Sequence, residues 1–497
     1  MGKWSLDGAR VGMESSEQAA EVDEQQPLKI VIIGDFSGRG SHRNAKLRGS
    51  GAIRALLIDR DNFEQVLQHL NVRLDDVPVK PSGEPGSVAI DSLDDFHPDS
   101  LLQRVATFRA LRELRSRLAK RETFADAMEE ARGLLQPPCE TQADAVLEPT
   151  SISNQSPSTD GGSLLDQILE SSETGSAPPP RRLNDIERFA QAMMAPYSIP
   201  ADDPRQEPWL EAADQAAAFA VKQLLQNERF RGLEARWRSL DWLTRRIDSD
   251  VAVKVAVIDL SEQELRADLD RDDLSQSALY ELLVTRPQAQ PDKKGWGVIV
   301  LDHHISAAIA DIELLGRLSQ IAADSKAKLL VGLSDDAVGC ARGRDPFTTG
   351  EFPEPSSVWR ALQQLPEIAH TTAVWPGFIL RQPYGKQTSE VESLELEELA
   401  GLDPHGALLV GNGAYLAAAQ LVRMHEEDAS NDYTGLPCVV LKDPSGQKLM
   451  VPASGLWLRD SGLEHLSSLG VTIAFSLPQA GAVRLFPLRN LLNNEGL

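Results

Sequence analysis

The sequence predicts an α/β fold in which a largely parallel sheet is flanked by helices. Apolar, β-branched runs at residues 28–33, 251–259, 297–302 and 328–333 have the length and composition of buried strands. Segments with helical periodicity, such as residues 305–323, stand between them. Strands that alternate with helices are typical of α/β domains, because parallel neighbours need a crossover connection.

The composition is that of an acidic protein with a sizeable core. The 497 residues are 41% hydrophobic and carry a formal net charge of −24. Phosphate-rich surfaces would be repelled by this charge, so we expect neither nucleic acid nor an anionic membrane as a partner. No apolar run approaches the ~20 residues that a membrane-spanning helix needs. Three widely separated cysteines have no metal-binding or disulfide spacing and indicate a reducing cytoplasm.

Residues 27–135 form the first predicted segment. Its opening strand ends in a glycine-rich turn at residues 34–40, and a second strand is expected at residues 55–59. The turn has neither the Walker nor the Rossmann glycine spacing. We therefore expect no nucleotide at this turn.

The rest of this segment is predicted to be mainly helical. A further strand is expected at residues 88–93, and leucine and arginine periodicity predicts one helical run over residues 101–118. Asp94 and Asp95 stand together before that helix. Carboxylates at a helix start commonly cap it, so we interpret them as capping groups and not as a catalytic pair.

Low-complexity composition marks an arm and a tether. Residues 1–26 are polar and acidic, and we expect a disordered N-terminal arm. Residues 136–182 are rich in Ser, Thr, Pro, Asp and Gly and form a predicted flexible tether to the second segment, residues 183–497. One amphipathic turn lies in this tether, and its apolar side chains are Leu164, Leu165, Ile168 and Leu169. It is either a docking motif or a short helix that folds back onto its own domain.

The helix predicted over residues 228–244 is distinguished by its residue types. Spacings of three and four place one apolar set on a single face: Phe230, Leu233, Trp237, Leu240 and Leu243. Glu234 and Arg238 have the favourable order for an i,i+4 ion pair. The pattern fits either an ordinary amphipathic core helix or a helix wedged at a subunit or domain junction, where Trp and Arg are favoured.

Asp302, His303 and His304 are the candidates for metal chemistry. They follow a predicted strand, and α/β sites gather at the carboxyl ends of strands. The same triplet occurs in a family of metal-dependent phosphoesterases, but the companion motifs of that family are missing here. We therefore expect no catalytic residue, no metal and no cofactor, and we keep a metal-dependent phosphoesterase as the alternative.

Several motifs resemble the two sheath subunits of the bacterial type VI secretion system. Phe-x-x-Leu-Glu-x-x-Trp-Arg at residues 230–238 and Phe-Ile-Leu-Arg-Gln-Pro-Tyr-Gly at residues 378–385 resemble segments of the large subunit (TssC). In the first segment, Gly-Asp-Phe at residues 34–36 and Asp-Phe-His-Pro-Asp at residues 95–99 are similar to motifs of the small subunit (TssB). The resemblance covers nearly all of the predicted folded part, in the order small subunit, tether, large subunit.

This resemblance implies a fused sheath protomer with mixed sheets and flanking helices, in which the two segments pack together. The large-subunit part would be shortened at its C-terminus. From the shortened end we expect weaker self-assembly than a complete protomer shows. Implied partners are other sheath or baseplate subunits and the inner tube protein, in an oligomeric assembly in the bacterial cytoplasm. Residues 164–169 would then bind a ClpV-like unfoldase. A sheath-derived capping or regulatory module is a second alternative. The implied interface residues are Phe230, Leu233, Glu234, Trp237, Arg238, Leu380, Arg381, Pro383 and Tyr384.

Overall fold

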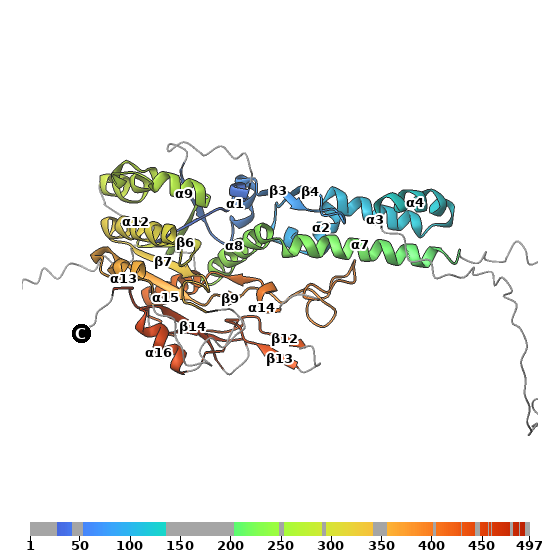
Figure 1. The fold of residues 1–497 in the computed structure, drawn as a ribbon. Helices are drawn as coiled ribbons and strands as arrows, with labels where there is room; N and C mark the ends of the chain where they lie inside the picture. Colours follow the sequence, from blue (N-terminus) through green and yellow to red (C-terminus); the bar gives the residue numbers. More distant parts are fainter. Residues whose placement is uncertain are drawn as a thin grey trace, which may run out of the picture. The chain divides into compact units, whose positions relative to one another are not determined.

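The computed structural model describes thirteen ranges of the chain (Figure 1). These ranges are 27–41, 53–135, 203–247, 253–290, 295–340, 355–400, 404–428, 430–442, 448–455, 457–458, 460–477, 481–486 and 488–492. They fall into two compact units, the first made of residues 1–113 and 214–497 and the second of residues 114–213. The predicted arm at residues 1–26 and the predicted tether at residues 136–182 lie outside the described residues, as does the amphipathic turn with Leu164, Leu165, Ile168 and Leu169.

The first unit is built on a nine-stranded sheet with the order β11-β15-β14-β8-β7-β6-β1-β5-β2. Its central six strands, from β14 to β5, run parallel, and antiparallel pairs attach β2 at one edge and β15 and β11 at the other. The predicted α/β fold with a mixed, largely parallel sheet is therefore confirmed. The strands are β1 (Leu28–Gly34), β2 (Ala55–Ile58), β5 (Val253–Asp259), β6 (Val298–Ile305), β7 (Lys328–Leu333), β8 (Thr371–Trp375), β11 (Asp432–Tyr433), β14 (Thr472–Ser476) and β15 (Val483–Leu485).

Strand β1 of the first segment lies between two strands of the second segment. Ile30 is in register with Val255 of β5 on one side and with Val298 of β6 on the other. From Ile30 to Ile33 the side chains are at most 1% exposed, as expected for a run that is apolar on both faces of a parallel sheet. The predicted packing of the first segment with the second is confirmed for β1 and β2, since β2 pairs with β5.

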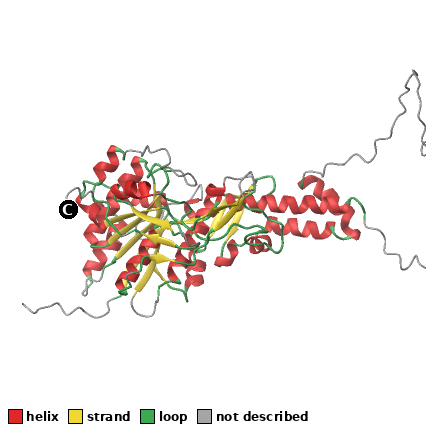
Figure 2. Ribbon diagram, turned by 90° about the horizontal axis from the view of Figure 1, so that it is seen from below, coloured by secondary structure: helices red, strands yellow, loops and turns green. Residues whose placement is uncertain are grey.

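Helices cover both faces of this sheet (Figures 1 and 2). On one face α9 (Glu262–Leu269) and α12 (Ile309–Ser325) share a core with alternate residues of β1 and β6. On the other face α15 (Ala414–His425) contacts β1, β6, β7 and β8, and α8 (Glu228–Thr244) packs on α15. Among the described helices none is long and apolar enough to span a membrane.

Shorter elements complete the first unit. Three two-stranded sheets pair β3 (Arg73–Pro78) with β4 (Pro85–Ala89), β9 (Phe378–Ile379) with β10 (Val410–Gly411), and β12 (Val439–Lys442) with β13 (Lys448–Val451). The remaining helices are α1 (Phe63–Leu70), α2 (Pro98–Arg104), α10 (Ala278–Tyr280), α11 (Arg286–Ala289), α13 (Ser357–Leu362), α14 (Pro404–Ala407) and α16 (Asp460–Ser468).

Two boundaries in the first segment differ from the prediction. The strand expected at residues 88–93 is β4, which ends at Ala89, and a 3-10 turn at Leu93–Phe96 follows it. Ser92 and Asp95 form a capping box there, so the chain turns before it can extend the strand, and the capping interpretation of Asp95 is confirmed. The helical run expected over residues 101–118 is two helices, because the extended backbone of Val105 separates α2 from α3 (Ala106–Leu118).

The second unit is helical in its described part. It contains the end of α3, the whole of α4 (Arg121–Leu134) and the start of α7 (Gln206–Gln226). The Gln206 side-chain amide donates a 2.8 Å hydrogen bond to the carbonyl oxygen of Leu118. Phe124 and Trp209 are buried, so apolar side chains hold these helical segments together.

Candidate functional site

Helix α8 is held by its apolar face against the first segment of the chain. Asn227 caps its N-terminus, where the side-chain oxygen accepts hydrogen bonds from the backbone N–H groups of Arg229 and Phe230. The Trp237 indole N–H donates a 2.9 Å hydrogen bond to the carbonyl oxygen of Phe36. Its ring packs edge-on against Phe36 and Phe63, with centroid distances of 5.5 Å to each. The five side chains of the predicted apolar face are all at most 1% exposed: Phe230, Leu233, Trp237, Leu240 and Leu243.

The other side of α8 carries a buried ion-pair network. Glu234 is fully buried and accepts 2.7 Å hydrogen bonds from Arg238 Nε and Arg381 Nε. Arg381 also bonds both carboxylate oxygens of Glu398, at 2.8 and 3.0 Å. Burial alone would raise the pKa of Glu234, but Arg381 and Arg238 outweigh it and hold that pKa below its usual value. The two carboxylates and two guanidinium groups therefore compensate one another.

This network reaches back to the first segment through Tyr384. The Tyr384 backbone N–H donates a 2.8 Å hydrogen bond to Glu398, and the Arg381 guanidinium lies 4.2 Å from the centre of the Tyr384 ring. The same ring meets His97 of the first segment edge-on at 5.1 Å. Burial raises the pKa of Tyr384 to about 12, so its hydroxyl remains protonated at neutral pH. Pro383 is buried beside it and Leu380 is partly exposed.

The structure thus places the predicted interface residues at a junction inside the chain. Phe230 meets Phe96 of the first segment edge-on at 5.6 Å, as Trp237 meets Phe36 and Phe63. The helix and these partners lie inside one compact unit, where its apolar face packs on the first segment of the same polypeptide, and its place at a junction between subunits stays a prediction. Side chains that are at most 1% exposed have no free surface, so these residues hold the two segments of the chain together.

A second polar cluster, which sequence reasoning missed, lies at the carboxyl ends of β1, β5 and β6. Arg236 Nε lies 2.5 Å from Asp302 Oδ2, and the Tyr415 hydroxyl donates a 2.9 Å hydrogen bond to Asp302 Oδ1. On β5, Asp259 accepts a 3.0 Å hydrogen bond from the Ser37 backbone N–H and forms an ion pair with Arg39. The only available signal was position, because each carboxylate stands at or just beyond the end of a predicted strand.

Asp35, in the Gly-Asp-Phe turn after β1, belongs to the same cluster. Its Oδ2 accepts a 2.9 Å hydrogen bond from the Gly40 backbone N–H, and its carbonyl oxygen accepts one of 2.6 Å from Arg236. Burial raises the pKa of the Asp35 carboxyl, and neighbouring Asp259 raises it further, against the opposing effect of Arg236. The glycine-rich turn is therefore hydrogen-bonded by groups of the chain itself, the Gly40 backbone and Arg236.

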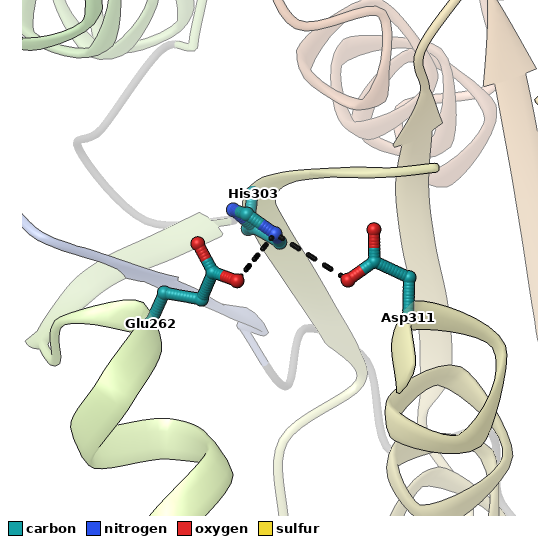
Figure 3. Close-up of side chains that lie close together, drawn as sticks. All are labelled: Glu262, His303 and Asp311. Carbon is teal, nitrogen blue, oxygen red and sulfur yellow. Dashed lines mark ion pairs between the residues drawn. The ribbon is translucent and has the colours of Figure 1, made fainter. Parts of the chain in front are cut away.

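The Asp302, His303 and His304 triplet does not converge on one point. Asp302 is committed to Arg236 and Tyr415, whereas His303 faces a different group, Glu262 and Asp311 (Figure 3). His303 Nε2 lies 3.5 Å from Glu262 Oε1 and 3.9 Å from Asp311 Oδ1.

Glu262, His303 and Asp311 have the donor types of a metal site, but a cation already lies among them. Arg266 Nη2 is 2.8 Å from the same oxygen of Glu262 and forms an ion pair with the same oxygen of Asp311. A metal ion at this position would be repelled by the Arg266 guanidinium or would have to displace it. Glu262, His303, Asp311 and Arg266 therefore form an ion-pair cluster. Within the described residues, the geometry offers no support for the phosphoesterase alternative.

Two protein-family models match the chain in the predicted order. Residues 9–145 match the family described as type VI secretion system, VipA, VC_A0107 or Hcp2. Residues 209–431 match VipB, described as EvpB/VC_A0108, tail sheath N-terminal domain. The second match contains α8, both predicted motifs of the large subunit and the strands β5 to β10.

Similar curated proteins include both sheath subunits of Pseudomonas aeruginosa (strain PAO1). The type VI secretion system sheath protein TssC1 is 25% identical over 226 residues, which are 43% of this chain and 45% of the relative. The sheath protein TssB1 is 30% identical over 112 residues, which are 22% of this chain and 63% of the relative. The matched part thus spans about half the length of the larger relative and less than two thirds of the smaller one.

The two family matches and the two curated relatives support a fused type VI secretion sheath protein, and the mixed α/β sheet is consistent with that class. More particularly, the chain joins a small-subunit-like (TssB, VipA) region to a large-subunit-like (TssC, VipB) region in one polypeptide, as the resemblance predicted.

Proposed function

We propose that this protein is a structural subunit of a contractile sheath, in which one polypeptide supplies both halves of the protomer. The observation that carries the proposal is the position of β1. A strand from the small-subunit-like region is hydrogen-bonded on both sides to strands of the large-subunit-like region, so neither region has a complete sheet alone. Joining them in one chain fixes their ratio and removes the entropy cost of bringing two molecules together.

The polar clusters support a structural role over catalysis. Asp302, Asp259 and Glu234 each use their carboxylate to hold arginine or backbone groups between segments that are far apart in sequence. Charges that are committed in this way fix the relative position of elements and are not available for proton transfer or metal binding. We propose that the chain is not an enzyme and needs no cofactor.

The proposed partners follow from the sheath role. They are other sheath or baseplate subunits and an inner tube protein, in the bacterial cytoplasm, with residues 164–169 as the proposed docking segment for a ClpV-like unfoldase. A sheath-derived capping or regulatory module remains the competing role, because a module that binds only the end of a sheath could share the same fold.

Electron microscopy of negatively stained particles separates these roles. The full chain is imaged alone and after mixing with separately purified small and large sheath subunits. Cylinders or stacked rings of the chain alone support the protomer role. Particles found only at the ends of cylinders made by the separate subunits support the capping role. If the chain neither assembles nor joins those cylinders, the proposed function is wrong.

A further inference from the structure

Two arginine side chains are stacked on neighbouring aromatic rings near the C-terminal end of α8. The Arg246 guanidinium lies 4.3 Å from the centre of the Trp242 ring, and the Arg423 guanidinium lies 4.4 Å from the centre of the Tyr433 ring. The two rings are 5.7 Å apart, with an angle of 55° between their planes. Trp242 also packs on buried Phe378 at 4.7 Å, so the platform beneath the arginines is anchored in the core. We call Trp242, Arg246, Arg423 and Met424 the arginine–aromatic patch, and Tyr433, which is 1% exposed, supports it from below.

Among the described residues, the positive charges of this patch are incompletely compensated. Arg423 donates a 2.9 Å hydrogen bond to the carbonyl oxygen of Asp432 and has Asp428 at 3.7 Å. The Asp432 carboxylate is already held by Arg484, at 2.6 and 2.8 Å. Arg246 donates to the carbonyl oxygen of Trp242, and within the described residues it forms no ion pair. Burial lowers the pKa of Arg246, and the repulsive like charge of Arg423 lowers it further, against the smaller opposing effects of Tyr433 and Asp241.

An incoming carboxylate would relieve this repulsion. A guanidinium group presents a planar fork of donors that matches a carboxylate, and the aromatic platform limits the conformations that the side chain would lose on binding. Although stacking on Trp242 partly desolvates its guanidinium, Arg246 remains solvent-exposed, and Met424 is 58% exposed. Arg, Trp and Met are residue types enriched in protein interfaces, and Trp and Arg are prominent among the residues that dominate their binding energy.

The chain itself indicates the partner. It carries 74 acidic against 50 basic side chains, so the surface of another copy is rich in carboxylates. We infer that the arginine–aromatic patch is a contact between copies of this chain, in which a carboxylate of the neighbouring copy enters between Arg246 and Arg423. This inference rests on the proposed assembly of the protein and adds the surface and the chemistry of one contact.

The test compares Arg246→Gln with Arg245→Gln in the full chain. Both substitutions remove one positive charge from adjacent positions, but Arg245 is already paired with Asp241 and is 62% exposed. We measure self-association by sedimentation velocity across a concentration series, at low salt and at 0.5 M salt. We expect Arg246→Gln to weaken self-association at least about tenfold and Arg245→Gln to change it less than about threefold.

Salt and stability measurements keep this test specific. The salt dependence of self-association should be smaller for Arg246→Gln than for the wild type, because one screened charge contact is gone. The melting midpoint of Arg246→Gln should not fall below that of Arg245→Gln, since removing Arg246 relieves repulsion inside the chain. A large drop in the Arg246→Gln midpoint would assign the residue a role in folding and overturn the inference.

Three other outcomes would also overturn it. Equal effects of the two variants would mean that net charge, and not this site, controls association. If Asp248→Asn combined with Asp250→Asn removes the difference between the two arginine variants, the counter-ion belongs to the same chain. If the wild type shows no self-association, the contact does not exist, and the proposed function is then decided by the mixing experiment with separate sheath subunits.

Discussion

Replacing Trp237 by alanine should be among the most damaging single changes in the described part of the chain. The ring is completely buried, packs edge-on on Phe36 and Phe63 at 5.5 Å each, and donates a hydrogen bond to the Phe36 carbonyl oxygen. Truncating a buried tryptophan to alanine costs about 3–5 kcal/mol in the free energy of unfolding. We expect the upper half of this range, because two aromatic contacts are lost and a buried carbonyl oxygen loses its donor.

Two further substitutions separate these contributions. Trp237→Phe keeps an aromatic ring but removes the N–H group, so we expect a loss of about 1–3 kcal/mol. Trp457→Ala is the matched control, because Trp457 is 42% exposed and its removal takes away little buried apolar surface. We expect it to change the free energy of unfolding by less than about 1 kcal/mol.

The stability of all three variants is measured by urea unfolding, followed by far-ultraviolet circular dichroism. This signal is suitable because it does not depend on tryptophan fluorescence. The expected order of midpoints is wild type and Trp457→Ala highest, Trp237→Phe between, and Trp237→Ala lowest. If Trp237→Ala and Trp457→Ala unfold at the same urea concentration, our placement of α8 at the junction of the two segments is wrong.

Three other predictions test the sheet, the buried network and the ion-pair cluster. Residues 183–497 produced alone should be insoluble or lack a cooperative transition, because β5 loses both of its neighbours, β1 and β2; a soluble fragment with a sharp melting transition would refute this. Glu234→Gln should cost about 3–5 kcal/mol at pH 7, against less than about 1 kcal/mol for Asp241→Asn, which breaks a more exposed pair. Because the folded-state pKa of Glu234 is lowered, its contribution to stability is present above the unfolded-state value of about 4.3 and is lost as pH falls through the folded-state pKa. The difference between wild type and Glu234→Gln in urea midpoint should therefore shrink below that pH, and a constant difference would contradict the assignment. Elemental analysis should find no stoichiometric zinc or manganese in the purified protein, and a metal that is lost in His303→Ala would overturn our assignment of this cluster.

Local patterns in the sequence predicted the parts of the site that lie on one element. The helical spacing of α8 identified its buried face, and the i,i+4 order of Glu234 and Arg238 predicted an ion pair that the structure contains, at 2.7 Å. These predictions succeed because residues three and four apart are neighbours on any helix. The boundary near Val105 was not predictable in this way, since leucine periodicity continues across it.

The contacts that complete the site join residues far apart in the chain, and no local pattern contains them. Arg381 meets Glu234 across 147 positions, and the Ser37 backbone meets Asp259 across 222. Likewise, the Asp302, His303 and His304 triplet has the composition of a metal site, yet the Asp302 and His303 side chains have different partners. Which carboxylate forms an ion pair with which arginine depends on the strand order, and the sequence pattern does not specify that order.

The sequence by itself determined the fold class, the buried face of α8 and, through its motifs, the order of a small-subunit-like region before a large-subunit-like region. Hydrophobic periodicity and short motifs are local properties, and they survive in a sequence without any tertiary information. Only the tertiary structure decided that β1 lies between β5 and β6, that the predicted interface residues join two segments of one chain, and that Arg266 lies where a metal would bind. The physical reason is that burial and ion pairing are gained between elements that only the folded chain brings together.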